Sequence, residues 1–124
     1  MFGKADAYRC GDSTLDAQTA QIVEHIGRMR ALATSAAAPS VLRRKLLVLI
    51  SFTLKHALDE EDAIERAKGP VAEYRDRHDR LAVIVSQEML RFVKGDPDAA
   101  FAIANAVELH LIEERPALRE ALRR

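Results

Sequence analysis

Four histidines occur in this 124-residue chain, and two of them are followed by a glutamate four residues later. The two pairs, His56–Glu60 and His110–Glu114, share the pattern His-x-x-x-Glu. Residues four apart lie on the same face of a helix, so each pair would present an imidazole beside a carboxylate. Imidazole with carboxylate favours iron, manganese or zinc, and the lack of thiolate disfavours a structural zinc site. The pairs therefore predict a metal centre.

The segments that carry these pairs are predicted to be long helices. Ala, Leu, Glu and Arg dominate the chain, and glycine and proline number only five and four. These breakers divide it into an arm (1–12), four helices (13–38, 40–68, 70–94 and 96–115) and a tail (116–124). Pro116 is expected to kink or end the last helix. Short connections between long amphipathic helices favour one all-α domain, an antiparallel up-down-up-down four-helix bundle.

Each predicted helix has one histidine on its apolar stripe: His25, His56, His78 and His110. A single such histidine is usually a packed core or boundary residue, and a small rotation could turn Glu60 to solvent. Buried histidine and glutamate are costly unless paired or bound to metal. Counted at about 1.5 Å of rise per residue from each turn, the four histidines fall in one layer. Independent core histidines have no reason to share a layer, so a common site is favoured.

With this ordered set, residues from about 15 to 114 resemble the hemerythrin-like proteins, also called the HHE cation-binding family. The resemblance implies two non-haem iron ions with an oxo or hydroxo bridge, manganese and zinc being weaker candidates. It implies Glu60 and Glu114 as bridging carboxylates. The full ligand set that we expect is His25, His56, Glu60, Tyr74, His78, His110 and Glu114.

The chain departs from the family pattern at two positions and is ambiguous at a third. Tyr74 stands where the third helix of the family has the first histidine of a pair, and Arg115 stands where oxygen carriers have an aspartate. A competing alignment places Thr19 at the first-helix ligand. We prefer His25, because it lies about 14 residues before Pro39 and Thr19 lies nearly two turns further away.

These departures affect the expected function. The resemblance implies binding of, or reaction with, O2, peroxide or NO. A Tyr74 phenolate ligand would stabilise ferric iron and favour a di-iron oxidase or a catalase-like peroxidase; alternatively, Tyr74 donates a hydrogen bond to Glu60 or to bound water. A metal-free helical bundle that acts through protein contacts is a third possibility. Whether the protein is an enzyme is left open.

Composition restricts the partners and the compartment. Nineteen basic and nineteen acidic residues give a formal net charge of zero, which predicts binding to neither nucleic acid nor an anionic membrane. The longest apolar run, residues 46–54, is about half of what a bilayer requires. A lone Cys10 and an N-terminus without a signal-like apolar segment favour the cytoplasm. Asp59 and Glu61, which flank the His56 motif, are expected to face solvent.

Overall fold

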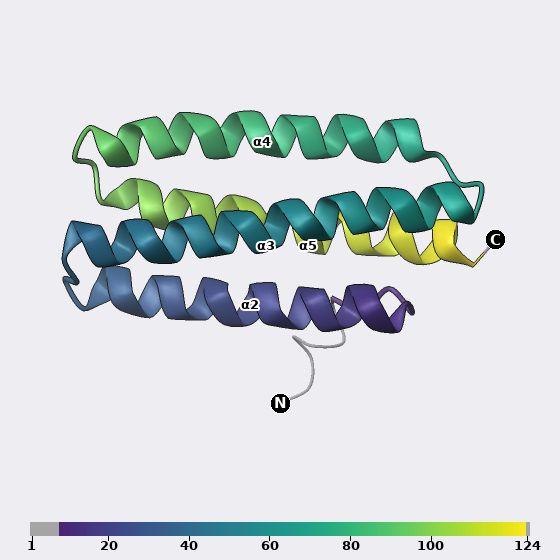
Figure 1. The fold of residues 1–124 in the computed structure, drawn as a ribbon, viewed down its shortest axis with the longest axis horizontal. Coiled ribbons are helices and arrows are strands. Elements are labelled where there is room, and N and C mark those ends of the chain that lie inside the picture. The colour runs from purple at the N-terminus through teal and green to yellow at the C-terminus, as the bar shows by residue number, and fades with distance from the viewer. Residues whose placement is uncertain (1–7, 124) are drawn as a thin grey trace.

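The structure is a computed structural model that describes residues 8–123. In this part of the chain the helices are α2 (Ser13–Thr34), α3 (Pro39–Arg66), α4 (Val71–Val93) and α5 (Asp98–Leu122). Each runs antiparallel to the one before it, and the α2–α3 and α4–α5 connections lie at the same end (Figure 1). The predicted all-α four-helix bundle is confirmed. None of these helices combines the length and the apolar character that a bilayer crossing requires.

The helices pack unequally, and this determines where the interior is accessible. α2 packs most closely on α3, and α4 on α5. α5 also contacts α2 and α3, and lies behind α3 in Figure 1, whereas α3 and α4 approach each other least of these pairs. The seam between α3 and α4 is therefore the loosest of those that the helices form.

Two apolar clusters fill the bundle, and a polar layer separates them along the helices. The larger cluster includes Ile22, Ile26, Met29, Leu46, Leu49, Ile103, Val107 and Leu111. The smaller cluster includes Cys10, Leu15, Ala63, Ile64, Tyr74 and Leu118. Along α2, α3 and α5, the buried polar side chains come between the members of the two clusters: Thr19, His56, Glu60, Glu114 and Arg115.

The start of α2 is fixed by two aspartates. Asp12 is the N-cap, and its carboxylate accepts a hydrogen bond from the backbone N–H of Leu15 at 3.0 Å. The Asp16 carboxylate accepts from the N–H groups of Cys10 and Gly11 at 2.7 and 3.2 Å. Acceptors at a helix N-terminus satisfy otherwise unpaired donors, so these contacts stabilise both the helix start and the segment before it.

The end of α2 differs from the sequence prediction. The helix ends at Thr34 and not at residue 38, and residues 35–38 form the connection to α3. Ala36 adopts a positive φ of 58°, a conformation that no helix continues through. Because these four residues are not helical, a residue's depth along the bundle is overestimated when it is counted back from Pro39 at helical rise.

The end of α5 also differs, because the helix passes through Pro116 and continues to Leu122. The predicted boundary at residue 115 and the separate tail were therefore wrong. Proline cannot donate to the carbonyl four residues earlier, which costs roughly 3 kcal/mol in a helix interior. Continuing the helix buries Leu118 completely and Ala121 almost completely. That burial in the smaller cluster offsets the loss.

Candidate metal site

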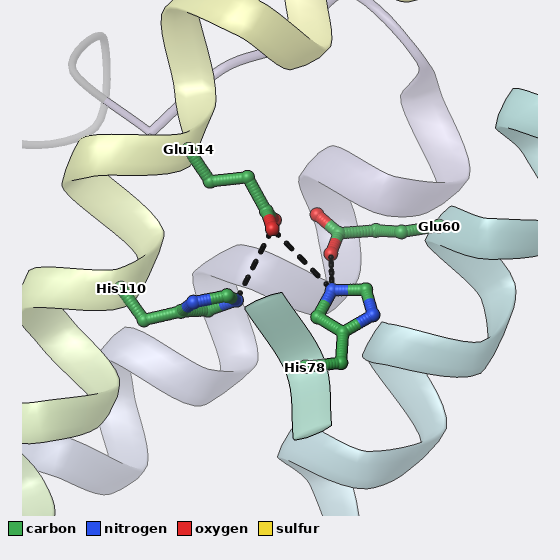
Figure 2. Close-up of side chains that lie close together, drawn as sticks. All are labelled: Glu60, His78, His110 and Glu114. Atoms are coloured by element: carbon green, nitrogen blue, oxygen red, sulfur yellow. Dashed lines mark hydrogen bonds and ion pairs between the residues drawn. The ribbon is translucent and has the colours of Figure 1, made fainter. Parts of the chain in front are cut away.

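Four side chains from three helices converge in the polar layer. Glu60 comes from α3, His78 from α4, and His110 and Glu114 from α5 (Figure 2). One ligand atom of each lies within 4.8 Å of the others. Glu60, His78 and Glu114 are buried, and the His110 side chain is 13% exposed. We call these four residues the ligand group.

The distances within the ligand group suit a bound metal ion. His78 Nε2 lies 3.1 Å from Glu60 Oε1 and 3.4 Å from Glu114 Oε2, and His110 Nε2 lies 3.3 Å from Glu114 Oε2. Ligands at about 2.1 Å from a metal are separated by about 3.4 Å in a tetrahedral site and by about 3.0 Å at adjacent positions of an octahedral site. Two imidazoles and two carboxylates are also the donors that divalent transition metals prefer. This group is compatible with a metal site inside the bundle.

Glu114 shows that the group is incomplete as a hydrogen-bond network. Among residues 8–123, its Oε2 is buried and makes no hydrogen bond, although the Nε2 atoms of His78 and His110 lie 3.4 and 3.3 Å away as ion-pair contacts. Burial and the nearby Glu60 charge raise the pKa of Glu114 to about 7, although His78 opposes this shift. Buried acceptors are normally satisfied, so the unpaired Oε2 is the kind of atom that a cation would satisfy.

The orientation of His78 is set by a residue that the sequence analysis assigned to solvent. Nδ1 of His78 lies 2.6 Å from Glu61 Oε2, and the Glu61 side chain is only 16% exposed. With the Nδ1 proton donated to Glu61, Nε2 faces Glu60 Oε1. A carboxylate that holds the second nitrogen of a histidine is the usual support for a metal-bound imidazole. Placing Glu61 at the solvent-facing surface was wrong.

The two histidines of the ligand group have opposite pKa shifts. Burial lowers the pKa of His78, but the carboxylates of Glu114, Glu60 and Glu61 outweigh it and raise the value to about 10. Burial dominates at His110 and lowers its pKa to about 4, so this imidazole is neutral at pH 7. A neutral imidazole is ready to bind a metal, whereas His78 must first release a proton.

Arg115 completes the other half of the polar layer, and its guanidinium is fully buried. Its terminal nitrogen donates to Glu60 Oε2 and, at 3.1 Å, to Glu114 Oε1. Its second terminal nitrogen donates to Thr19 Oγ1 at 3.3 Å, and Nε donates to the Leu111 carbonyl at 3.2 Å. Glu60 and Glu114 thus each contact the guanidinium through one oxygen and the ligand group through the other. Their role as bridges between two metal ions stays a prediction.

His56 lies on the Arg115 side of these two carboxylates. Its Nδ1 is 2.8 Å from Gln18 Oε1, while its Nε2 is 3.1 Å from Glu60 Oε2 and 3.2 Å from Thr19 Oγ1. Nε2 is also 3.5 Å from a terminal nitrogen of Arg115. The Nε2 atom of His56, which could otherwise bind a metal, therefore lies close to both the Glu60 carboxylate and the Arg115 guanidinium. We call His56, Thr19 and Arg115 the arginine half.

The carboxylate of Glu60 is shared by both halves. Burial raises its pKa, but hydrogen bonds with His56 and His78 and the charge of Arg115 outweigh the burial, so the pKa lies well below its usual range. Glu60 is consequently an anion at neutral pH. It links the arginine half electrostatically to the ligand group.

The structure does not bring His25 to this layer. Its ring stacks on Phe52 with centroids 4.9 Å apart, and Thr19 is the α2 residue that reaches His56. The depth count failed because it treated residues 35–38 as helical. Counted from the true ends of the helices, Thr19 lies 15 residues before Thr34 and His56 lies 17 after Pro39.

Tyr74 lies beside the layer, within the smaller apolar cluster. It is 2% exposed, and the Arg77 guanidinium lies over its ring, 5.4 Å from the centroid. Burial, Glu114 and Glu60 raise the pKa of its phenol, although Arg77 opposes them. Tyr74 is thus a neutral phenol at pH 7. Its role as a metal ligand stays a prediction.

Three residues of the layer were not assigned to the site from the sequence: Gln18 and Glu61, which contact the histidines, and Arg115, which contacts both carboxylates. Arg115 had a visible signal, since it occupies a core position between Leu111 and Leu118 at helical spacing.

Comparison with known proteins adds no identification: no family model, curated protein or solved structure matches this chain.

Proposed function

We propose that this protein binds one transition-metal ion, with iron as the first candidate, in the ligand group. We further propose that the ion binds or reacts with O2, peroxide or NO. The observation that supports the metal is the convergence of Glu60, His78, His110 and Glu114 within 4.8 Å in a buried layer. Histidine with carboxylate and open coordination positions is the donor set of many non-haem iron proteins. Manganese and zinc are weaker candidates.

The proposal of one ion, and not two, rests on Arg115. The resemblance to hemerythrin-like proteins implies a second iron that shares Glu60 and Glu114 and binds His56. In the structure a guanidinium contacts both carboxylates and faces His56 Nε2. Arginine stays protonated under all ordinary conditions, so a second cation in the same place would be repelled. We keep the family resemblance as a proposal, with Arg115 as a fixed substitute for one metal.

Iron bound at this site would supply redox chemistry and an open coordination position for a small ligand. The chain supplies the remainder. Glu61 holds the His78 imidazole in one tautomer, and Arg115 holds one oxygen of Glu60 and one of Glu114, which leaves their other oxygens for the ligand group. The apolar clusters flank this layer on both sides along the helices.

A metal titration tests the proposal directly. Metal-free full-length protein should bind one equivalent of Fe2+ under anaerobic conditions, and one equivalent of Co2+ with the visible absorption of a protein-bound ion. No stoichiometric binding would overturn the proposal and favour the metal-free interaction module. Two equivalents would show that Arg115 does not replace a metal. The reduced iron form, exposed in turn to O2, NO and peroxide, should show a spectral change with at least one.

The ferric form also tests the Tyr74 prediction. A phenolate bound to ferric iron gives an intense visible charge-transfer band, which Tyr74→Phe should abolish. The same band in Tyr74→Phe, or a ferric sample without it, would remove Tyr74 from the ligand set. Neither result would affect the four residues of the ligand group.

A further inference from the structure

A cavity of about 420 Å³ lies in the seam between α3 and α4 and reaches the ligand group. Its inner end includes Glu60, His78 and His110. Most of its remaining wall is aliphatic, and the larger aliphatic side chains include Ile50, Leu54, Leu58, Leu81, Val85 and Leu111. Arg75 and Asp79 add charged side chains to the wall. Small-molecule sites have volumes of roughly 300–1,000 Å³, apolar walls and a few convergent polar groups. This cavity has all three properties.

The cavity exists because small side chains face the loosest seam of the bundle. Ala57 on α3 and Ala82 and Ser86 on α4 line it, and none of them can fill the space between the helices. Leu54 and Leu58 on the wall remain 60% and 57% exposed. Two large exposed leucines, one turn apart, leave apolar area that a hydrocarbon chain would bury.

The charges at the inner end restrict the head group of such a ligand. Glu60 and Glu61 line the inner end beside His78 and His110. A six-coordinate ion such as Fe2+ or Co2+ in the ligand group would keep two positions beyond the four protein donors, and an anionic oxygen ligand would fill one of them. The same seam then offers an apolar path from the cation to solvent.

We propose that this cavity binds an amphipathic monocarboxylate, with its carboxylate at the metal ion and its hydrocarbon chain between α3 and α4. The inference rests on the proposed metal site. Affinity should rise with chain length, because each buried methylene contributes about 0.8 kcal/mol, or about fourfold in affinity. It should also require the metal, because the carboxylate head group would bind the ion itself.

Calorimetry on the full chain loaded with Co2+ tests both requirements, with acetate, butanoate, hexanoate and octanoate as probes. Octanoate should bind at least about 100-fold more tightly than acetate, given the methylene contribution. Metal-free protein should bind none of them measurably. In the Co2+ form, octanoate should change the visible spectrum, because the head group enters the coordination sphere.

Ala82→Trp would fill the seam from an exposed position on α4, and Ala72→Trp is the matched control on the same helix, outside the cavity. Ala82→Trp should weaken octanoate binding at least tenfold and leave acetate binding and metal stoichiometry unchanged. Ala72→Trp should change none of these.

Four outcomes would overturn the inference, and they differ in what else they affect. Co2+ binding with equal affinity for acetate and octanoate would reject the apolar chain but leave the metal proposal intact. Octanoate binding to metal-free protein, or octylamine binding in its place, would reject the metal-bound carboxylate. No Zn2+, Co2+ or Fe2+ binding at all would reject both proposals. A dimer that Ala82→Trp dissociates would show that a second copy of the chain covers the seam.

Discussion

The two halves of the polar layer have similar side chains but differ in the groups that face the shared carboxylates. In the ligand group, His78 and His110 direct Nε2 toward Glu60 and Glu114, and one carboxylate oxygen is left without a hydrogen-bond partner. In the arginine half, His56 directs Nε2 toward the same Glu60 carboxylate, but Arg115 supplies the positive charge. The carboxylates therefore face a permanent cation, the guanidinium, on one side and imidazoles on the other, where His78 must release a proton before a metal can bind.

This difference shows how a bundle could keep the geometry of a two-cation centre with one of the cations built into the chain. A guanidinium has five donors in a fixed plane, so it can hold two carboxylates, a hydroxyl and a backbone carbonyl together. A metal ion binds similar groups but can exchange its ligands. On our proposal, reactivity is confined to the ligand group, and the arginine half is structural.

The largest expected effect is the loss of metal binding when the ligand group is broken. His110→Ala removes one of two imidazoles and should raise the metal dissociation constant at least about 1,000-fold, equivalent to about 4 kcal/mol. His25→Ala is the control, because the His25 ring stacks on Phe52 outside the group. A competition titration against a chelator measures both. Equal weakening in the two variants would mean that the ligand group is misassigned.

Removing the built-in cation should affect folding more than metal binding. Arg115→Met leaves Glu60 and Glu114 buried without their shared donor, and breaking a buried pair from one side costs roughly 3–5 kcal/mol. Urea unfolding of the metal-free protein should show this loss. Arg115→Lys, which retains the charge, should lose less. A metal-free Arg115→Met protein as stable as the parent would contradict a structural role for the guanidinium.

The arginine half can also be converted toward the pattern of the hemerythrin-like proteins that the sequence resembles. Thr19→His with Arg115→Asp supplies an imidazole and a carboxylate around His56, in place of a hydroxyl and a cation. Metal stoichiometry should rise from one to two equivalents, measured by elemental analysis after gel filtration. Thr19→His alone should stay at one, because the guanidinium remains. Two equivalents in that single variant would contradict the exclusion of a second ion by Arg115.

The sequence was sufficient for the bundle and for the residues of the ligand group, because both depend on local helical spacing. His56–Glu60 and His110–Glu114 are one turn apart in any helix, and short connections make the bundle antiparallel. His25 was misplaced because its level depends on where α2 ends, and four loop residues shift that level by about 6 Å at helical rise.

The side-chain partners were harder to foresee. Glu61 follows Glu60 and would face solvent on an isolated helix, but α4 places His78 within 2.6 Å of it. Arg115 looked like a lost ligand, whereas its reach back to Glu60 and Thr19 makes it the centre of its own half. Such contacts depend on how the helices rotate and pack, which no pattern within one helix determines.

Glu61 should matter more for metal binding than its partly exposed position suggests. Glu61→Gln keeps the shape but weakens the hold on the His78 Nδ1 proton, and loss of such a supporting carboxylate typically lowers metal affinity 10–100-fold. Glu65→Gln is the matched control, since Glu65 also pairs with Arg75 but is 64% exposed. The control should change affinity less than about twofold. Equal affinities in the two variants would show that Glu61 does not position His78.

The smallest effect should come from Gln18, which supports His56 as Glu61 supports His78. Gln18→Ala leaves His56 Nδ1 without its acceptor, at a cost of about 1–2 kcal/mol of unfolding free energy. Gln21→Ala, at an exposed position of the same helix, is the control and should have little effect. Metal affinity should change less than about threefold in either variant, or about 0.7 kcal/mol. If Gln18→Ala instead weakened metal binding as much as Glu61→Gln, His56 would belong to the metal site, and the two halves would be one functional centre.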